Sequence, residues 1–197
     1  MRRELNAFLK NRGFRDWIGF CFFSGTAIYA GVKGIREETL WLVLPMVHHG
    51  VIAVLFLLRK PAKKEDGLGL ILAMLAIFWP TGAGGVVPSG FCGFLGLIGL
   101  ALIFWALGTL GSSFGLAAAD RGLVMGGPYR FVRHPMYLGE LVYQGAALCG
   151  HFSTLRLSMF LIFVILQVAR IQREERLIET YPQYVEKVRW RLIYGIW

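Results

Sequence analysis

The sequence predicts an all-α integral membrane protein, built as a helical bundle of five or six transmembrane helices. Of its 197 residues, 56% are hydrophobic and only 17% are charged, a more apolar balance than soluble domains have. Several apolar runs approach the length of about 20 residues with which an α-helix crosses a hydrocarbon core. The net charge of +9 comes from residues that flank these runs, so it indicates membrane topology and argues against a nucleic-acid partner.

Six apolar runs are the expected helices. They lie at about residues 16–33, 39–59, 67–86, 90–111, 135–150 and 153–171. The fifth run is short, so it either crosses fully or pairs with the sixth as a hairpin that does not. The helical pattern of the sixth continues to Thr180, before Pro182, so this helix should project beyond the hydrocarbon. We divide the chain into N-terminal transmembrane helices, residues 1–104, and a C-terminal core, residues 105–197.

The Lys and Arg residues predict the orientation of the helices. Of the 21, 18 lie in the N-terminal segment, in the loop after the second run, in the 112–134 loop or in the C-terminal segment. The three in the alternate loops are Lys33, Arg36 and Arg156. Because Lys and Arg are enriched on the cytoplasmic side, both termini and the 112–134 loop are expected to face the cytoplasm. We expect the inner membrane of a bacterium or an archaeon.

Close packing is the expected role of the glycines at positions 90, 93, 96 and 99 in the fourth run. Small residues allow membrane helices to approach each other closely. The alternative is that a ligand lies against this helix. The glycines permit packing within one chain or between two, so the oligomeric state stays open.

Cysteines and histidines also occur inside the apolar runs. No CxxC or Cys/His pattern surrounds Cys21, Cys92 and Cys149, so we expect buried structural thiols, with no disulfide framework and no metal. Intramembrane histidines are candidates for function, but His48 and His49 have no carboxylate or cysteine close in sequence. For these two we favour a structural role, in which the neutral imidazole bonds to a nearby backbone group.

The densest polar cluster is the segment GPYRFVRHPMYLGE at residues 127–140. Polar groups are costly at a bilayer edge, so a cluster at the start of the fifth run indicates a polar ligand. A proline follows His134 and suits a first helical turn, whose backbone donors favour a carboxylate or phosphate. Tyr129 and Tyr137 can offer a ring face and a hydroxyl. The alternative is anchoring at the lipid headgroups, which we favour for Arg130 only.

A second polar cluster, RIQREER at residues 170–176, ends the sixth run. Arg170 and Glu174 are four residues apart and share one face of the helix. Glu174 and Glu175 are adjacent, so only one of them can point the same way as Arg170. A lone cation at the membrane edge usually has a partner or a ligand.

Together the two clusters resemble the signature of membrane-embedded methyltransferases, the isoprenylcysteine carboxyl methyltransferase family and its phospholipid N-methyltransferase relatives. The resemblance covers roughly residues 105–197 and rests on the RHPxYxG core and on the Glu-Glu pair. A Tyr-rich stretch, YPQY at residues 181–184, and a short C-terminal tail follow, as in that family. Tyr194 stands where relatives usually carry proline, and this departure concerns the shape of the tail.

The resemblance implies an enzyme that transfers a methyl group from S-adenosylmethionine to a lipophilic acceptor and leaves S-adenosylhomocysteine. The cofactor would bind on the cytoplasmic side, between the RHPxY helix and the last helix. Its expected contacts are Leu123, Val124, Tyr129, His134, Pro135, Met136, Tyr137, Glu174 and Glu175. Arg170 matches the position that faces the acceptor, and the expected catalytic residues are Arg170 and Glu174.

The acceptor stays open among an isoprenylated cysteine carboxylate, a phospholipid amine and a thiol, and it is expected to enter from the lipid. A second class shares part of the pattern: membrane sterol and steroid reductases carry Arg-His-x-x-Tyr-x-Gly-Asp/Glu and use NADPH. Pro135 and the Glu-Glu pair favour methyl transfer. The third alternative is a non-enzymatic membrane scaffold or transporter subunit whose basic loops bind anionic lipid.

Overall fold

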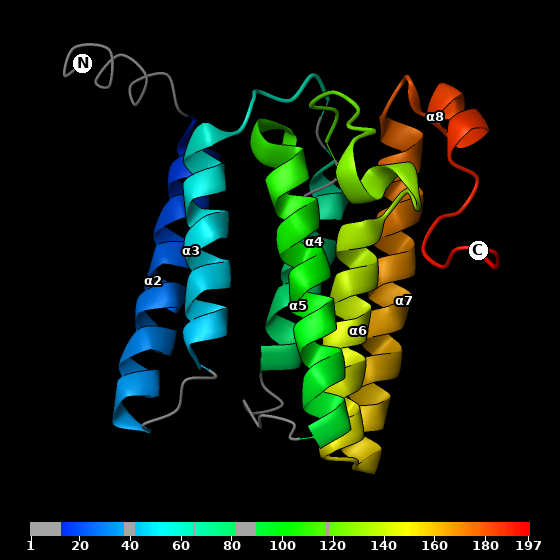
Figure 1. The fold of residues 1–197 in the computed structure, drawn as a ribbon. Helices are drawn as coiled ribbons and strands as arrows, with labels where there is room; N and C mark the ends of the chain where they lie inside the picture. Colours follow the sequence, from blue (N-terminus) through cyan, green and yellow to red (C-terminus); the bar gives the residue numbers. More distant parts are fainter. Residues whose placement is uncertain (1–12, 38–41, 65, 82–89, 117–118) are drawn as a thin grey trace. The chain divides into compact units, whose positions relative to one another are not determined.

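A computed structural model describes residues 13–37, 42–64, 66–81, 90–116 and 119–197, and these form helices and connecting loops. The predicted all-α class is confirmed. The main helices are α2 (Phe14–Arg36), α3 (Val43–Leu58), α4 (Gly67–Thr81), α5 (Gly90–Leu110), α6 (Pro135–Gly150), α7 (Thr154–Leu177) and α8 (Tyr181–Lys187), as Figure 1 shows. Two short 3-10 helices, η2 (Gly111–Ser113) and η3 (Gly127–Arg130), lie between α5 and α6.

Several helices have the length and composition of membrane spans. Among the described residues, α2, residues 90–113 and α7 are each long and apolar enough to cross a membrane, and α3 and α4 contribute shorter apolar segments. Large apolar side chains such as Phe94 on α5 and Ile165 on α7 are exposed, as expected for faces that meet lipid. These observations agree with a membrane-embedded helical bundle.

The chain divides into two compact units, residues 1–60 and 61–197. In the first unit α2 packs against α3, and Gly19 gives the ring of Phe56 room that a Cβ atom would occupy. His49 lies against Phe23, with ring centroids 5.8 Å apart. Its Nδ1 atom is buried without a hydrogen-bond partner in the described part of the chain, so this atom does not make the expected backbone bond.

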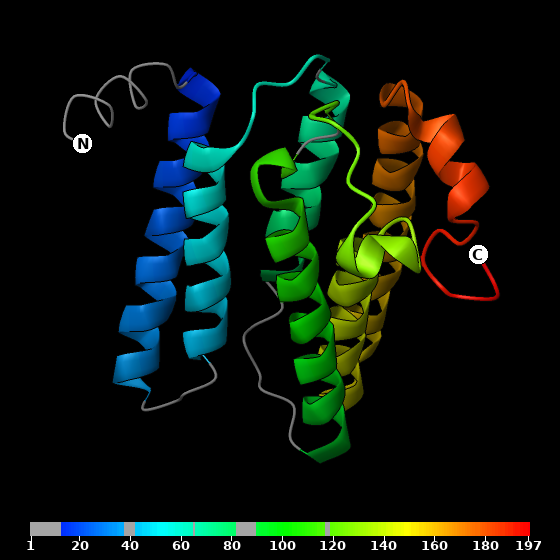
Figure 2. The ribbon, with the colours of Figure 1, turned by 45° about the horizontal axis from the view of Figure 1, so that its top comes forward.

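The second unit contains α4 to α8, and α5 lies directly against α6 (Figure 2). The two backbones meet at Gly99 and Gly139. A Cβ atom added to Gly99 would lie 2.7 Å from the backbone nitrogen of Tyr143, and one added to Gly139 would lie 2.8 Å from the Gly99 carbonyl oxygen. Real Cβ atoms do not approach backbone atoms so closely, so the close packing predicted for the fourth run is confirmed at Gly99.

The expectation of three buried thiols is wrong. Cys92, near the start of α5, forms a disulfide with Cys149, near the end of α6, and Cys21 is exposed. The close α5–α6 contact brings the two Cα atoms to 5.8 Å, within disulfide range. The partners are 57 residues apart, so no short sequence pattern announces the pair.

The last long helix is shorter than predicted. It ends at Leu177, not at Thr180, because Ile178 is extended, with φ −84° and ψ 114°. A separate helix, α8, then begins at Tyr181 with Pro182 in its first turn. Proline has no backbone N–H to continue α7, and it is well tolerated where a new helix starts. The resulting turn carries α8 and the C-terminal tail back over one end of the second unit.

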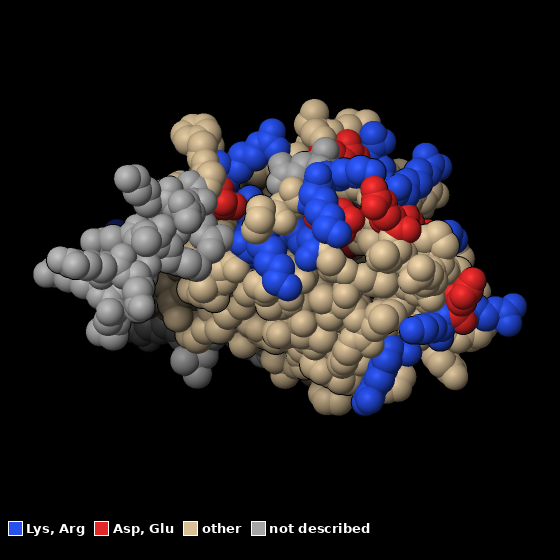
Figure 3. Space-filling model, turned by 90° about the horizontal axis from the view of Figure 1, so that it is seen from above, with Lys and Arg blue, Asp and Glu red and all other residues tan. Residues whose placement is uncertain are grey.

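Charged side chains gather at that end of the second unit. Figure 3 looks onto it and shows Lys and Arg side chains gathered there with Asp and Glu. Two connecting segments join at this end: Lys63 donates its backbone N–H to Asp120, and Asp120 donates to Lys64, at 2.8 and 3.0 Å. These backbone hydrogen bonds join the loop that precedes α6 to the segment that precedes α4.

Candidate functional site

The C-terminal tail docks on the segment that leads into α6. The backbone N–H of Arg133 donates to the Trp190 carbonyl at 2.8 Å, and that of His134 donates to the Arg191 carbonyl at 2.9 Å. Leu192 is buried against Tyr137 and Ile171. The tail therefore pairs the backbone N–H groups of Arg133 and His134, and it fixes the start of α6.

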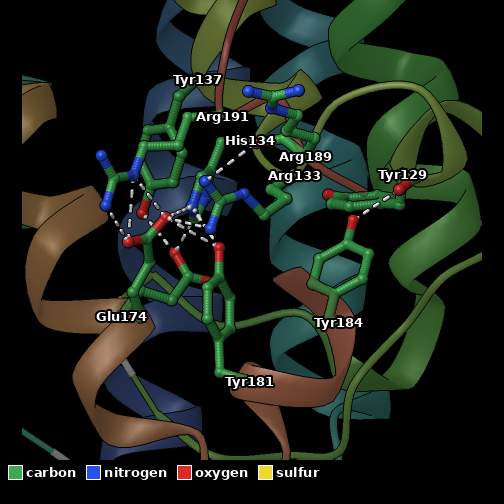
Figure 4. A network of polar contacts seen from close by, with 10 residues as sticks. Tyr129, Arg133, His134, Tyr137, Glu174, Tyr181, Tyr184, Arg189 and Arg191 are labelled. Carbon is green, nitrogen blue, oxygen red and sulfur yellow. Dashed lines mark hydrogen bonds and ion pairs between the residues drawn. The ribbon is translucent and has the colours of Figure 1, made fainter. Parts of the chain in front are cut away.

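Glu175 is the centre of a part-buried polar network beneath this tail. Figure 4 shows the network and labels its other members, among them His134, Tyr181 and Arg191. Its carboxylate accepts hydrogen bonds from Nε and Nη2 of Arg191 and from the hydroxyl of Tyr181, over distances of 2.9 to 3.1 Å. Nη1 of Arg133 lies 3.3 Å away. The Glu175 side chain is 12% exposed, so these protein groups meet most of its carboxylate.

His134 lies between the two glutamates of α7. Its Nε2 atom is 3.2 Å from Glu175 Oε1 and 2.9 Å from the Tyr181 hydroxyl. The imidazole also stacks on the Tyr181 ring, with centroids 6.2 Å apart. Nδ1, on the other side of the ring, is 4.0 Å from Glu174 Oε2. One ring nitrogen is therefore held by the network, and the other faces Glu174.

Glu174 is much more open than its neighbour. Its side chain is 32% exposed, and its Oε2 atom accepts a hydrogen bond of 3.0 Å from the hydroxyl of the buried Tyr137. The predicted difference between the adjacent glutamates is thus found: Glu175 points into the network, and Glu174 points toward Tyr137 and a pocket.

The pocket is small and open on one side, with a cavity volume of about 40 Å³. The end of α5 and the loop after it, η3, the start of α6 and one residue of α7 form its walls. Its lining residues are Leu110, Ser113, Gly115, Ala119, Tyr129, His134, Met136, Tyr137 and Glu174. The lining combines apolar and aromatic surface with a carboxylate, an imidazole and hydroxyls, which is typical of small-molecule sites.

The tyrosine hydroxyls around the pocket stay protonated. Burial, and then the charge of Glu174, raise the pKa of Tyr129 well above its usual value. Burial and the nearby Glu175 raise the pKa of Tyr181 in the same way. Burial also raises the pKa of Tyr184, whose hydroxyl donates to the Tyr129 carbonyl. These hydroxyls can therefore donate hydrogen bonds, as those of Tyr181 and Tyr184 do.

A further polar layer lies one helical turn away from the Tyr137–Glu174 pair. Arg170 is 4% exposed; it donates from Nη1 to Gln167 at 2.7 Å and from Nη2 to the Leu116 carbonyl at 3.3 Å. The guanidinium carbon lies 4.7 Å from the centre of the Tyr137 ring. Gln167 in turn donates to Glu140. Arg170 therefore has partners, as expected, and these partners are groups of the protein itself.

A comparison with protein families assigns this part of the chain. The family model of the phospholipid methyltransferases matches residues 87–183, a segment that contains every pocket-lining residue. This segment belongs to the phospholipid methyltransferase family. A comparison with curated proteins finds no match. Family membership implies a membrane methyltransferase, and methyltransferases of this family generally use S-adenosylmethionine.

The structure brings together part of the site predicted for a methyltransferase. Five predicted cofactor contacts line the pocket: Tyr129, His134, Met136, Tyr137 and Glu174. The pocket lining does not include the other predicted residues, which are Leu123, Val124, Pro135, Arg170 and Glu175. Leu123 and Val124 are half-buried in the loop before η3. The assignment of all five of these residues to the cofactor or the acceptor stays a prediction.

Sequence reasoning missed two sets of residues in this methyltransferase segment. The first is the pocket wall formed by Leu110, Ser113, Gly115 and Ala119. The run of small residues after α5 was the available signal for this wall. The second is the pair Glu140 and Gln167, polar residues inside apolar runs. Glu140 and Gln167 lie on different helices, and nothing in the sequence indicates that their side chains contact each other.

Proposed function

We propose that this protein is an S-adenosylmethionine-dependent membrane methyltransferase and that the pocket holds the cofactor. The observation that carries the proposal is the convergence of Tyr129, His134, Met136, Tyr137 and Glu174 on one pocket inside the family segment. Four of them lie within residues 129–137, Glu174 comes from α7, and the resemblance assigned all of them to the cofactor.

The lining residues fit the chemical groups of this cofactor. His134 can donate to its carboxylate, and the open carboxylate of Glu174 can accept from adenine or ribose donors. The ring of Tyr129 suits a sulfonium cation, because aromatic rings attract positive charge. The apolar atoms of Leu110 and Met136 complete a partly dry environment.

The cofactor supplies an activated methyl group on a sulfonium, so the protein's part is positioning and exclusion of water. Glu175 and Tyr181 orient the imidazole of His134. Arg170 lies against Tyr137, which in turn donates to Glu174. No side chain needs to be covalently modified. Loss of one positioning group should therefore slow transfer without stopping it.

We infer that the pocket faces the cytoplasm of a bacterium or an archaeon. The distribution of Lys and Arg supports this orientation. The disulfide supports it independently, because Cys92 and Cys149 lie at the ends of α5 and α6 opposite to the pocket. Disulfides persist in oxidising compartments, such as the periplasm, and are rare in the cytosol. The acceptor is a lipophilic molecule that reaches the site from the bilayer.

Methyl transfer in membranes tests the proposed function. Membranes that contain the protein should move labelled methyl groups from S-adenosylmethionine into the lipid fraction, and His134→Ala should reduce this rate at least about tenfold. Arg130→Ala is the matched control, since Arg130 is exposed and outside the pocket lining. Oxidation of NADPH without methyl transfer would contradict the proposal and indicate a reductase.

A further inference from the structure

The disulfide, the glycine contact and the pocket lie at successive positions along the α5–α6 pair. The bond between Cys92 and Cys149 joins the two helices at one end. Gly99 and Gly139 bring the two backbones together further along. At the other end Leu110, the last residue of α5, lines the pocket together with residues from the start of α6. The glycine contact therefore lies between the disulfide and the pocket.

The glycine contact has the properties of a pivot. Neither Gly99 nor Gly139 has a side chain that could interlock with the opposite helix, and the hydrophobic effect does not hold helices together in lipid as it does in water. At a rise of about 1.5 Å per residue, Gly99 is roughly 10 Å from Cys92 and roughly 16 Å from Leu110 along α5. A displacement at the disulfide end is therefore enlarged at the pocket end. The covalent bond is a second fixed point that prevents such rocking.

Movement of α5 would reach the pocket by two routes. Leu110 is itself part of the lining. The ring centroids of Trp105 on α5 and of Phe131, which directly follows η3, are 6.5 Å apart, and η3 contributes Tyr129 to the lining. The tail fixes the start of α6 through the backbone N–H of His134. The width of the pocket therefore depends on the position of α5.

The disulfide is open to reagents in solution. Cys149 is exposed and Cys92 is half-buried. The turn that follows α6 contains the exposed residues His151 and Ser153, and Arg156 donates to the His151 carbonyl at 2.9 Å. Backbone and polar groups outside the helices need water, so this turn marks an aqueous edge of the membrane. Exposed disulfides are more readily reduced than enclosed ones, and regulatory disulfides are of this kind.

We propose that the Cys92–Cys149 disulfide is a redox switch that controls cofactor binding from the opposite end of α5 and α6. This inference rests on the proposed function and goes beyond it, because it adds regulation to the pocket. In the oxidised protein the bond holds α5 at the spacing that brings the five predicted cofactor contacts together. In the reduced protein α5 rocks about Gly99, the lining residues separate, and the cofactor binds more weakly.

A dithiol on the disulfide side of the membrane is the reductant that the switch needs. One thiolate of the dithiol attacks a sulfur of the disulfide, the S–S bond breaks, and a mixed disulfide forms. The second thiol of the reductant then attacks the mixed disulfide and releases the protein. Two electrons and two protons pass from the dithiol to Cys92 and Cys149, and the dithiol becomes a disulfide. Reoxidation reverses the exchange.

Cofactor affinity in the two redox states tests the switch. In detergent-purified protein, dithiothreitol should weaken S-adenosylhomocysteine binding by about tenfold, within the usual range for coupling between distant sites, and reoxidation should restore it. Cys92→Ser and Cys149→Ser should bind as weakly as the reduced protein and should not respond to dithiothreitol. Cys21→Ser is the matched control, because Cys21 is an exposed free thiol on α2. This variant should bind and respond like the wild-type protein.

Hydrogen–deuterium exchange gives a second measurement that needs no cofactor. Peptides from residues 105–113 and 135–141 form or adjoin the pocket end of α5 and α6. They should exchange faster in the reduced protein, because looser packing opens these backbone hydrogen bonds more often. Peptides from α3, which packs against α2 in the first unit, should exchange equally in both states.

The outcomes separate the switch from the proposed function. Equal or tighter S-adenosylhomocysteine binding in the reduced protein would overturn the switch and leave the disulfide as a passive link. So would a loss of affinity that reoxidation does not reverse, or a response to dithiothreitol in Cys92→Ser. If the serine variants do not fold, reversible reduction of the wild-type protein decides. A wild-type protein that binds no S-adenosylhomocysteine in either state would contradict the proposed function, and unchanged exchange at the pocket end would then overturn the switch as well.

Discussion

Glu174 and Glu175 are neighbours in the sequence, but α7 turns their carboxylates toward different surroundings. Glu175 meets Arg133, Arg191 and Tyr181 and is 12% exposed, whereas Glu174 meets the Tyr137 hydroxyl and is 32% exposed. Removing a partner from a buried ion pair is more costly than removing an open carboxylate, because the remaining charge stays buried. The two residues should therefore differ in what their loss changes.

We predict that Glu175→Ala destabilises the fold, while Glu174→Ala leaves it nearly intact. The first change leaves Arg133, which is 7% exposed, without its carboxylate and should cost about 3 kcal/mol. The second removes one hydrogen bond from Tyr137, which is worth about 1 kcal/mol. Thermal denaturation of both variants in the same detergent measures the difference. Equal midpoints would contradict the role assigned to Glu175.

At the scale of elements, the pocket depends on the contact between α5 and α6. Leu110 at the end of α5 and Met136 at the start of α6 both line it, so the spacing of these helices sets its width. Gly99 and Gly139 allow that spacing, because side-chain atoms at these positions would collide with the opposite backbone. The tail adds a second constraint through its bonds to Arg133 and His134.

We predict that Gly99→Ala separates α5 from α6 and lowers both stability and methyl transfer. The added methyl group would lie 2.7 Å from the Tyr143 nitrogen, and backbone cannot move aside at low cost. Gly108→Ala on the same helix is the matched control, since nothing lies within 4 Å of the added atom. Activity and thermal midpoint should fall only in Gly99→Ala. A similar result for both variants would show that the close approach is unimportant.

At the scale of the whole molecule, charge and cysteine chemistry indicate the same orientation. The pocket, the tail and α8 lie at one end of the second unit, and the disulfide lies at the opposite ends of α5 and α6. The exposed Tyr194 in the tail offers a position at which the side of the membrane can be read directly.

We predict that Tyr194→Cys, in a Cys21→Ser background, reacts with a membrane-impermeant maleimide in inside-out vesicles but not in intact cells. Tyr194 is 73% exposed, so access depends on the side of the membrane and not on burial. Cys92 and Cys149 should stay unreactive until the disulfide is reduced. Labelling in intact cells would place the tail outside the cytoplasm and contradict the orientation.

The sequence predicted the helices because apolar runs and charged flanks are local signals. Each of the six predicted runs overlaps a helix, although residues 39–41 and 82–86 lie outside the described residues, and the end of α7 was extended too far, to Thr180. The disulfide and the polar layer could not be predicted, because they join residues on different helices whose contact depends on packing at Gly99 and Gly139. Motif resemblance supplied five pocket residues, but it could not tell that Glu175 is enclosed by Arg133 and Arg191.

Calorimetric titration of the detergent-purified protein with S-adenosylhomocysteine tests the cofactor pocket most directly. We predict micromolar binding to the wild-type protein and to Arg130→Ala, and affinity at least about tenfold weaker in Glu174→Ala, equivalent to about 1.4 kcal/mol. Because Glu174→Ala should remain folded, its loss of affinity would report on the pocket. Absence of binding to the wild-type protein, or equal affinity in Glu174→Ala, would contradict the assignment of this pocket to the cofactor.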